Sequence, residues 1–298
     1  MNASKRKKMS LSKRHNLTGW GFLAPAAILI LIMSFVPMVK ALILSFQTGI
    51  GANMKPAGLF NYQRMFQDKV FMTALKNNFL YLIIQVPIML ILALVLASML
   101  NNKDLKFKGL FRTCIFLPCA TSLVSYAIVF RTLFAMDGFV NTFLMKLHII
   151  DQGINWLANP TTARAVIIIA LIWRWTGYNM VFYLSGLQNI DYSVYEAARI
   201  DGASPFQSFW KITVPLLKPT ILLTTIMSTN GTLQLFDESV NLTNGGPSNA
   251  TITMSHYIYN MSFKYTPNFG YAAAMSYLIL ILVAILALVQ MKVGDKRE

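Results

Sequence analysis

The sequence predicts an all-α, polytopic membrane protein with six transmembrane helices, organised as a single domain over residues 1–298. Of its 298 residues, 55% are hydrophobic and only 12% are charged, whereas about a quarter of the residues of a soluble domain are usually charged. Six long apolar runs approach the roughly 20 residues that a helix needs to cross a bilayer. So few charges could not solvate the surface of a water-soluble protein of this size.

The apolar runs place the spans at about residues 20–46, 77–100, 111–134, 164–186, 216–236 and 270–291. The first run follows a basic segment, as the apolar part of a cleaved signal peptide would. It is long for a signal peptide, it contains Pro25 and Pro37, and no small-x-small cleavage site follows it. We therefore interpret this run as the first span and keep the signal peptide as the less favoured alternative.

The distribution of lysine and arginine predicts the orientation, because short cytoplasmic loops are enriched in these residues. The basic N-terminal tail (residues 1–19), the links after the second and fourth spans, and the C-terminus together hold 16 of the 26 basic residues. Six spans put these four segments on one side of the bacterial cell membrane. We expect both termini to be cytoplasmic and residues 241–265 to be exposed outside.

The net charge of +15 is explained by this topology and by contact with anionic lipid headgroups. It therefore does not indicate nucleic-acid binding. Cys114 and Cys119 would lie about 140° apart on a helix, so we expect small packing residues rather than a disulfide or a metal site. The sequence has no G-x-x-x-x-G-K-[ST] phosphate loop and no Cys/His cluster with metal-ligand spacing. It predicts no catalytic, cofactor or metal site in this chain.

The link at residues 191–219 predicts a compact helix–turn–helix at the cytoplasmic surface. Ser193 could cap a short first helix, and Gly202 falls where a helix commonly ends in a left-handed conformation. Ser204 is the next N-cap, Pro205 takes the first helical position, and Gln207 completes an S-x-x-Q capping box.

Two prolines, Pro215 and Pro219, should close the second helix of this link and lead into the fifth span. The first helix offers two alanines beside one acid, which would allow a partner protein to approach closely. An amphipathic connector lying on the lipid headgroups would have similar features. The residues alone leave both interpretations open.

The same segment reads "EAARIDGA" followed by "PFQSFWKITVPLLKP", and it resembles the EAA signature of binding-protein-dependent ABC importer permeases. The resemblance continues through "INWLANP" (154–160), "LTNGGPSNATIT" (242–253) and "GYAAAMS" (270–276), and covers nearly the whole chain. "TNGGP" and "YIY" are similar to the carbohydrate branch, which includes the maltose-system and glycerol-phosphate-system permeases. Asp191 departs from the pattern, since many members have proline there.

The resemblance implies a type I ABC importer permease fold and a set of partners. These are a homologous second permease that completes a heterodimer, two cytoplasmic ATPase subunits that bind ATP and Mg, and an extracytoplasmic sugar-binding protein. No cofactor would be bound by this chain, and the substrate would be a carbohydrate. The resemblance also makes residues 191–219 an EAA coupling loop that docks on an ATPase, through Glu196, Ala197, Ala198, Asp201, Gly202 and Ala203.

Polar residues inside the spans are candidates for the substrate path, because hydrocarbon disfavours them and they must face protein or water. Aromatic rings with amides and an arginine suit sugars, which present apolar faces and many hydroxyls. The candidates are Arg174, Trp175, Tyr178, Asn179, Asn230 and Gln234. In the alternative interpretation, the arginine snorkels or pairs with the second permease and the amides join helices.

An ATP-independent secondary transporter or channel is the main alternative function, since six spans alone do not exclude it. A coupling segment such as "EAARIDGA" would have no role in such a protein. A membrane enzyme fits less well still, because the spans lack convergent His, Asp or Glu residues.

Overall fold

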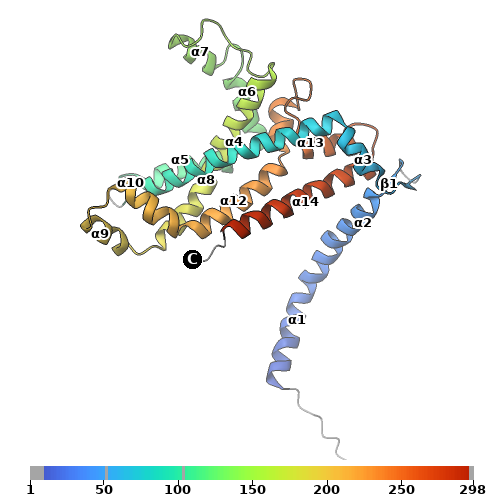
Figure 1. The fold of residues 1–298 in the computed structure, drawn as a ribbon, viewed down its shortest axis with the longest axis horizontal. Coiled ribbons are helices and arrows are strands. Elements are labelled where there is room, and N and C mark those ends of the chain that lie inside the picture. Colours follow the sequence, from blue (N-terminus) through green and yellow to red (C-terminus); the bar gives the residue numbers. More distant parts are fainter. Residues whose placement is uncertain (1–9, 51–52, 103–104, 295–298) are drawn as a thin grey trace, which may run out of the picture.

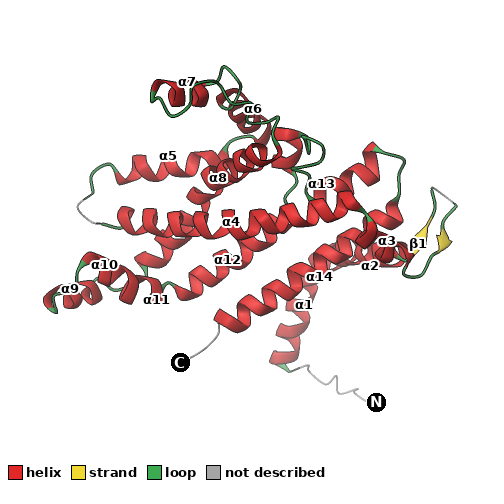
Figure 2. Cartoon of the chain, turned by 45° about the horizontal axis from the view of Figure 1, so that its top comes forward, coloured by secondary structure: helices red, strands yellow, loops and turns green. Residues whose placement is uncertain are grey.

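The structure is a computed structural model that describes residues 10–50, 53–102 and 105–294, and Figure 2 shows that it is built almost entirely from helices. Within these residues the strands β1 (Gln47–Thr48) and β2 (Lys55–Pro56) form one short antiparallel pair. Residues 1–9 of the expected basic tail lie outside the described residues. Residues 11–19 of that tail are already helical, because the first helix begins at Leu11, with Ser10 as its N-cap.

The helical elements include short π-helical turns, labelled η. In chain order they are α1 (Leu11–Ile30), η1 (Leu31–Phe35), α2 (Val36–Ser45), α3 (Phe60–Gln67), α4 (Lys69–Leu100), α5 (Lys108–Ala120), α6 (Leu123–Leu133), α7 (Phe139–Lys146), α8 (Pro160–Gln188), α9 (Ser193–Ile200), α10 (Pro205–Ser208), η2 (Phe209–Thr213), α11 (Val214–Leu216), α12 (Lys218–Leu233), η3 (Ser239–Thr243), α13 (Met254–Tyr259), η4 (Asn260–Lys264) and α14 (Phe269–Gly294).

The predicted fold class is confirmed among the described residues. Four helices are long and apolar enough to cross a membrane: the continuous segment Leu11–Ser45, α4, α8 and α14. Two bent pairs raise the number of candidate spans to six if each pair counts as one. These pairs are α5 with α6, bent by 99°, and the segment Pro205–Leu216 with α12, bent by 71°.

The third expected span, 111–134, is therefore not one straight helix. Pro118 lies in the last turn of α5, and its carbonyl oxygen accepts a hydrogen bond of 2.7 Å from the hydroxyl of Thr121. Thr121 is extended, with φ −74° and ψ 151°, and α6 then starts in a new direction. Cys114 is exposed on α5 and Cys119 is half-buried, so only Cys119 fits the expected packing role.

The α4 and α8 helices lie side by side through the centre of the bundle (Figure 1). On α4, Ala93 and Ala97 are fully buried, which lets the two backbones approach closely. On the other side of α8, a Cβ atom at Gly177 would lie 2.0 Å from the carbonyl oxygen of Ile115 in α5. Only glycine allows α5 to cross α8 at this distance, so this contact fixes the broken third span against the bundle.

The second expected span, 77–100, begins earlier in the structure, at Lys69. Asp68 caps α4, because its Oδ1 accepts hydrogen bonds from the backbone N–H groups of Val70 (2.9 Å) and Phe71 (3.2 Å). Its Oδ2 accepts from the hydroxyls of Tyr257 (2.7 Å) and Tyr271 (2.8 Å). The carboxylate thus joins the start of α4 to α13 and α14.

These contacts determine the pKa of Asp68. Partial burial by itself would raise the pKa, but the hydrogen bonds from the two tyrosines and from the backbone outweigh it and hold the pKa below its ordinary value.

Two asparagines of α4 hold the segment that follows α12. The side-chain amide of Asn78 donates to the carbonyl oxygens of Thr232 (3.0 Å) and Leu233 (2.9 Å), and its Oδ1 accepts from the backbone N–H of Met254 (3.0 Å). Asn77 donates to the carbonyl of Ile252 at 2.8 Å. The end of α12 and the start of α13 are thereby packed against α4.

The segment 241–265, which we expected to be exposed, is largely folded against the bundle. A continuous stretch, 250–254, is buried, because the α4 asparagines satisfy its backbone polar groups. Its exposed residues include the turn at Ser248 and Asn249 and the stretch 263–265.

The α1 helix stands apart from this bundle. None of its described side chains is buried, and Figure 1 shows it leading away from the other helices. The continuous α2 segment returns to α14, where the hydroxyl of Tyr277 donates to the carbonyl of Met38 at 2.6 Å. A Cβ atom at Gly270 would lie 2.1 Å from the carbonyl oxygen of Gln47, so α14 also packs closely against the end of this segment.

Candidate substrate cavity and coupling loop

A cavity of about 290 Å³ lies between α4, α8, α12 and the segment after α12. It brings together four of the six residues expected in the substrate path, and leaves out Arg174 and Asn230. The four that line it are Trp175, Tyr178, Asn179 and Gln234. Because α8 supplies three of them within two turns, the helical period explains why they share one face.

The aromatic residues of the cavity are half-buried. The rings of Trp175 and Tyr178 are perpendicular, with centroids 5.8 Å apart, and Tyr178 makes a similar edge contact with Phe182 at 5.1 Å. Each ring therefore has fixed neighbours. Fixed aromatic faces of this kind can pack against the C–H surface of a ligand.

Two amide side chains at the cavity differ in burial and in their hydrogen-bond partners. Asn179 is buried and donates to the carbonyl of Trp175 at 3.0 Å. Gln234 is exposed and donates to the side-chain oxygen of Asn230, one turn away. Asn230 thus lies beside the cavity and fixes the orientation of Gln234.

Arg174 does not line the cavity. Its side chain is 5% exposed, and Nη2 donates to the carbonyl oxygens of Thr121 (3.1 Å) and Cys119 (3.4 Å) at the break between α5 and α6. Its guanidinium also lies over the ring of Tyr126, 5.0 Å from the centroid. A positive charge at the carbonyl end of α5 complements the helix dipole there, so Arg174 holds the bend of the broken span in place.

Several cavity residues were missed by the sequence analysis, among them Gln85, Asp237 and Glu238. Gln85 of α4 is buried, accepts from the hydroxyl of Thr232 at 3.1 Å and donates to the sulfur of Met89 at 3.0 Å. Glu238, in the segment after α12, is 4% exposed. An amide inside an apolar run was a usable signal for Gln85, whereas Glu238 lay beyond the end of the fifth expected span.

The expected coupling loop is a helix–turn–helix at one end of the bundle, formed by α9 and α10 (Figure 1). The first cap is not Ser193, which is the first residue of α9. Instead, the carboxylate of Asp191 accepts the backbone N–H of Ser193 at 3.0 Å. This hydrogen bond is the largest of the influences that lower the pKa of Asp191. An acid thus serves at the position where the family resemblance led us to expect a proline.

The turn between the two helices has the predicted chemistry. Gly202 has φ +79°, and the next residue, Ala203, donates its N–H to the carbonyl of Ala198 at 2.9 Å, which is a Schellman-type ending. Ser204 and Gln207 form the reciprocal capping box: the Ser204 N–H donates to Oε1 of Gln207 at 2.8 Å, and the Gln207 N–H donates to Oγ of Ser204 at 3.2 Å.

The second helix of the loop ends differently from our expectation. Pro215 lies inside the short helix α11, and the chain bends at Leu217 before Pro219 enters the first turn of α12. A proline in a first turn leaves no hydrogen bond unmade, so the two prolines start helical segments rather than closing one.

The six expected coupling residues do not all reach the surface. Ala198 is buried against the loop, and Ala203 is half-buried. Those that are exposed are Glu196, Ala197, Asp201 and Gly202. Beside them Ile200 is 85% exposed and Phe206 is 73% exposed, which gives the tip of the loop an apolar surface with two acids.

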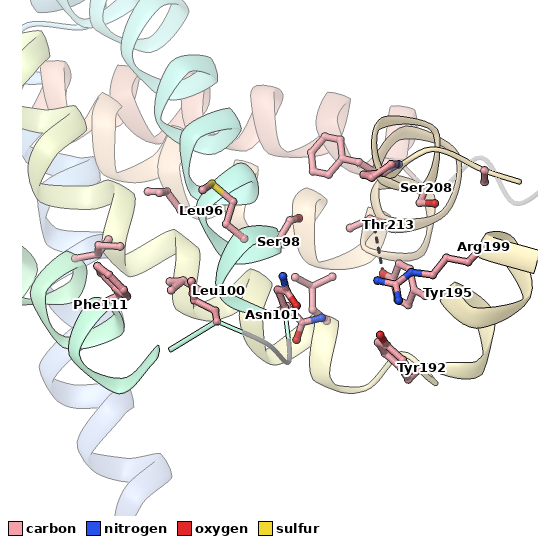
Figure 3. A pocket seen from close by; sticks show the side chains of 18 residues that line it. Leu96, Ser98, Leu100, Asn101, Phe111, Tyr192, Tyr195, Arg199, Ser208 and Thr213 are labelled. Carbon is pink, nitrogen blue, oxygen red and sulfur yellow. Dashed lines mark hydrogen bonds between the residues drawn. The ribbon is translucent and has the colours of Figure 1, made fainter. Parts of the chain in front are cut away.

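A second cavity, of about 690 Å³, lies behind the loop. Figure 3 shows Tyr195 and Arg199 of α9 on one side of it and Leu96 and Phe111 of the α4 and α5 ends on the other. The hydroxyls of Tyr195 and Thr213 are 3.1 Å apart and join the two helices of the loop. The loop is thus braced internally, with open space between it and the spans.

Comparison with known proteins gives a consistent result. Residues 89–296 match the model of the family described as "Binding-protein-dependent transport system inner membrane component". The lactose transport system permease protein LacF of Rhizobium radiobacter is 50% identical over 293 residues, with 98% of each chain covered. The arabinooligosaccharides transport system permease protein AraP of Bacillus subtilis (strain 168) is 33% identical over 276 residues, 92% of this chain and 87% of that protein.

Among solved structures, a chain of a bacterial ABC transporter involved in the import of the acidic polysaccharide alginate superposes with a TM-score of 0.81. That alignment covers 95% of this chain and 96% of the other, at 23% identity. At this identity the likeness is one of fold.

Proposed function

The chain belongs to the family of binding-protein-dependent transport system inner membrane components, and we propose that it forms one half of the path for a di- or oligosaccharide in an ATP-driven importer. Members of this family are membrane-embedded permease subunits of ABC importers. The observation that carries the proposal is the cavity between α4, α8 and α12, with its aromatic faces and amides.

We take lactose as the first substrate to test, because the relative that is 50% identical over nearly the whole chain is a lactose permease. The second relative carries arabino-oligosaccharides by its name, and the two together support a carbohydrate of two or more rings. An aromatic pair beside amides is suited to such a ligand, since sugar rings stack on aromatic faces while their hydroxyls need hydrogen-bond partners.

ATP hydrolysis would be supplied by separate subunits docked on α9. The tip of the loop supports this proposal, because its exposed apolar side chains and acids have no partner surface within the described residues. A rigid helix of this kind can transmit closure of the ATPases to α8 and α12, which flank the loop. Such coupling requires that the ATPase contact differ between the inward- and outward-facing states.

A second, homologous permease would complete the path, and α1 is the element that supports this proposal most directly. It leaves the bundle without burying any described side chain, so lipid or another subunit must cover it. The loop α9–α10 and the end of α14 lie at the same end of the bundle (Figure 1). This common end, with its lysines and arginines, would be cytoplasmic.

Import by reconstituted vesicles tests the function. The chain is assembled with its second permease, two ATPases and binding protein in proteoliposomes, and uptake of radiolabelled lactose is followed with ATP or a non-hydrolysable analogue. We expect uptake only with ATP and loaded binding protein together. Uptake driven by a proton or sodium gradient without ATP would show a secondary transporter instead. Uptake of arabino-oligosaccharides but not lactose would contradict only the choice of sugar.

A further inference from the structure

Glu238 is a buried acid at the substrate cavity. Its side chain is 4% exposed, it lines the cavity, and its Oε1 has no hydrogen-bond partner among the described residues. A buried carboxylate oxygen without a partner is costly, and a glutamine or leucine at this position would avoid the negative charge. Its presence therefore calls for a ligand or a partner that is present for only part of the transport cycle.

Arg174 does not supply this partner. It attracts the Glu238 carboxylate, but the hydrogen bonds of its Nη2 go to backbone carbonyls at the α5–α6 break. Its Nε and Nη1 form no hydrogen bond. Burial raises the pKa of the Glu238 carboxyl, and the attraction of Arg174 offsets this only in part, without a hydrogen bond to the carboxyl. Asp237, the next residue, adds negative charge and cannot donate a hydrogen bond.

The amides that line the cavity are already engaged with protein. Gln85 is bonded through both its amide nitrogen and its oxygen, and Asn179 donates to Trp175. The Glu238 carboxyl is stabilised by hydrogen bonds from its own backbone N–H and from the Trp175 side chain, but its buried Oε1 remains open at the cavity. The carboxylate of Asp237 also lines the cavity, but that residue is only half-buried. A carboxyl oxygen without a partner can accept a hydrogen bond from a hydroxyl group of a ligand.

We infer that Glu238 is a specificity-determining residue that accepts hydrogen bonds from hydroxyl groups of the transported sugar. The inference rests on the proposed function and extends it to a residue that the apolar pattern of the spans did not mark. The ring carbons of the sugar would lie against Trp175 and Tyr178 while its hydroxyls face the carboxylate. Sugars without hydroxyls at the matching positions would leave the carboxylate unpaired and would be rejected.

Import from saturating, sugar-loaded binding protein tests this inference, because the binding protein's own affinity then does not enter the rate. The variants are Glu238→Ala, Glu238→Gln and, as a control, Asp151→Asn, which removes an exposed acid in the loop after α7. Each complex is given lactose and lactose analogues in which one hydroxyl at a time is replaced by hydrogen. Stimulation of ATP hydrolysis by loaded binding protein is measured alongside.

We expect Glu238→Ala to lower the import rate of lactose by about 10- to 100-fold, which is the effect of losing a hydrogen bond to a charged group. Glu238→Gln keeps one acceptor oxygen and should lose less, and Asp151→Asn should match the wild type. The wild-type complex should also reject the analogue that lacks the partner hydroxyl. The Glu238→Ala complex should import that analogue and lactose at equal rates.

Two results would overturn the inference. One is an unchanged import rate in Glu238→Ala. The other is an equal loss for every analogue together with a lower yield of assembled complex, which is what a purely structural role predicts. A wild-type complex that imports none of a panel of di- and oligosaccharides would instead contradict the proposed function itself, and the Glu238 inference with it.

Discussion

Buried polar side chains in this protein differ in what satisfies them. Asn78 makes three hydrogen bonds to backbone groups of its own chain, and Arg174 makes two at the bend of the third span. These residues hold non-helical backbone inside a membrane protein, where no water is available to do so. Glu238 has hydrogen bonds from its own backbone and from the Trp175 side chain, but its Oε1 has no partner among the described residues. This open oxygen distinguishes Glu238 from the side chains that hold the fold together.

Asp68 is a second acid whose environment has a measurable consequence. Its folded-state pKa lies below the ordinary value because two tyrosines and two backbone N–H groups donate to it. Its contribution to stability is therefore complete above the unfolded-state pKa of about 4 and is lost as the pH falls through the lower folded-state pKa. We expect the wild type to be more stable than Asp68→Asn at pH 6, with the difference shrinking below about pH 4.

Thermal unfolding of the purified complexes across this pH range measures the difference. Tyr257→Phe removes one donor and leaves the other tyrosine in place, so it should give a smaller loss with the same pH dependence. A difference between wild type and Asp68→Asn that persists unchanged at pH 3 would contradict the hydrogen-bond explanation.

Sequence reasoning found those cavity residues that stand out chemically within an apolar run. Tyr178 and Gln234 could be selected because aromatic and amide groups are uncommon in a lipid-facing position. Glu238 could not be selected in this way, because it lies beyond the last apolar residue of its run, where the sequence predicts a loop. Its burial depends on Asn78, which lies more than 150 residues earlier in the chain and pins the end of α12 against α4.

At the scale of elements, the coupling role of the α9–α10 loop can be tested at its turn. The backbone there has a conformation that glycine adopts freely and other residues adopt only with strain. A Cβ at Gly202 would meet no atom within 4 Å, but φ is +79°. Gly202→Val should therefore distort the turn through the backbone alone, at a cost of about 1–2 kcal/mol. We expect this variant, and Glu196→Lys at the exposed tip, to insert normally and to lose most ATP-driven import.

Gly109→Val is the matched control, since a Cβ there also meets open space and the residue lies in a helix with ordinary φ. Co-purification of the ATPase with each variant reports docking directly. Wild-type import rates in both Gly202→Val and Glu196→Lys would rule out a coupling role for the loop.

The elements themselves were predictable to different degrees. The capping box and the left-handed glycine of the loop follow from short-range chemistry, and both were predicted. The bend of 99° between α5 and α6 was not, although Pro118 marks its place. A proline can kink a helix or end it, and here the outcome depends on Thr121 and on Arg174, which approaches from a distant helix.

At the scale of the whole molecule, the orientation of the six candidate spans is the main prediction. The loop α9–α10 and the end of α14 share one end of the bundle. The orientation of the bundle in the membrane therefore decides on which side both of them lie. We expect intact cells to be labelled by an impermeant thiol reagent at Ser248→Cys and not at Ser10→Cys. Both sites are exposed, and Cys114 and Cys119 are first replaced by serine so that the probe is the single thiol.

Permeabilised cells should label both positions, which controls for reactivity. Labelling of Ser10→Cys in intact cells, with Ser248→Cys protected, would reverse the orientation. It would also place α9 outside the cell, where no ATPase could reach it.

The isolation of α1 also bears on how the protein is made. Because none of its described side chains packs into the bundle, α1 needs no later part of the chain to complete its environment. It can enter the bilayer as soon as it leaves the ribosome, and the basic residues before it then fix which way it faces. In the proposed orientation, α1 would thus be in place in the membrane before Glu238 or the coupling loop has been translated.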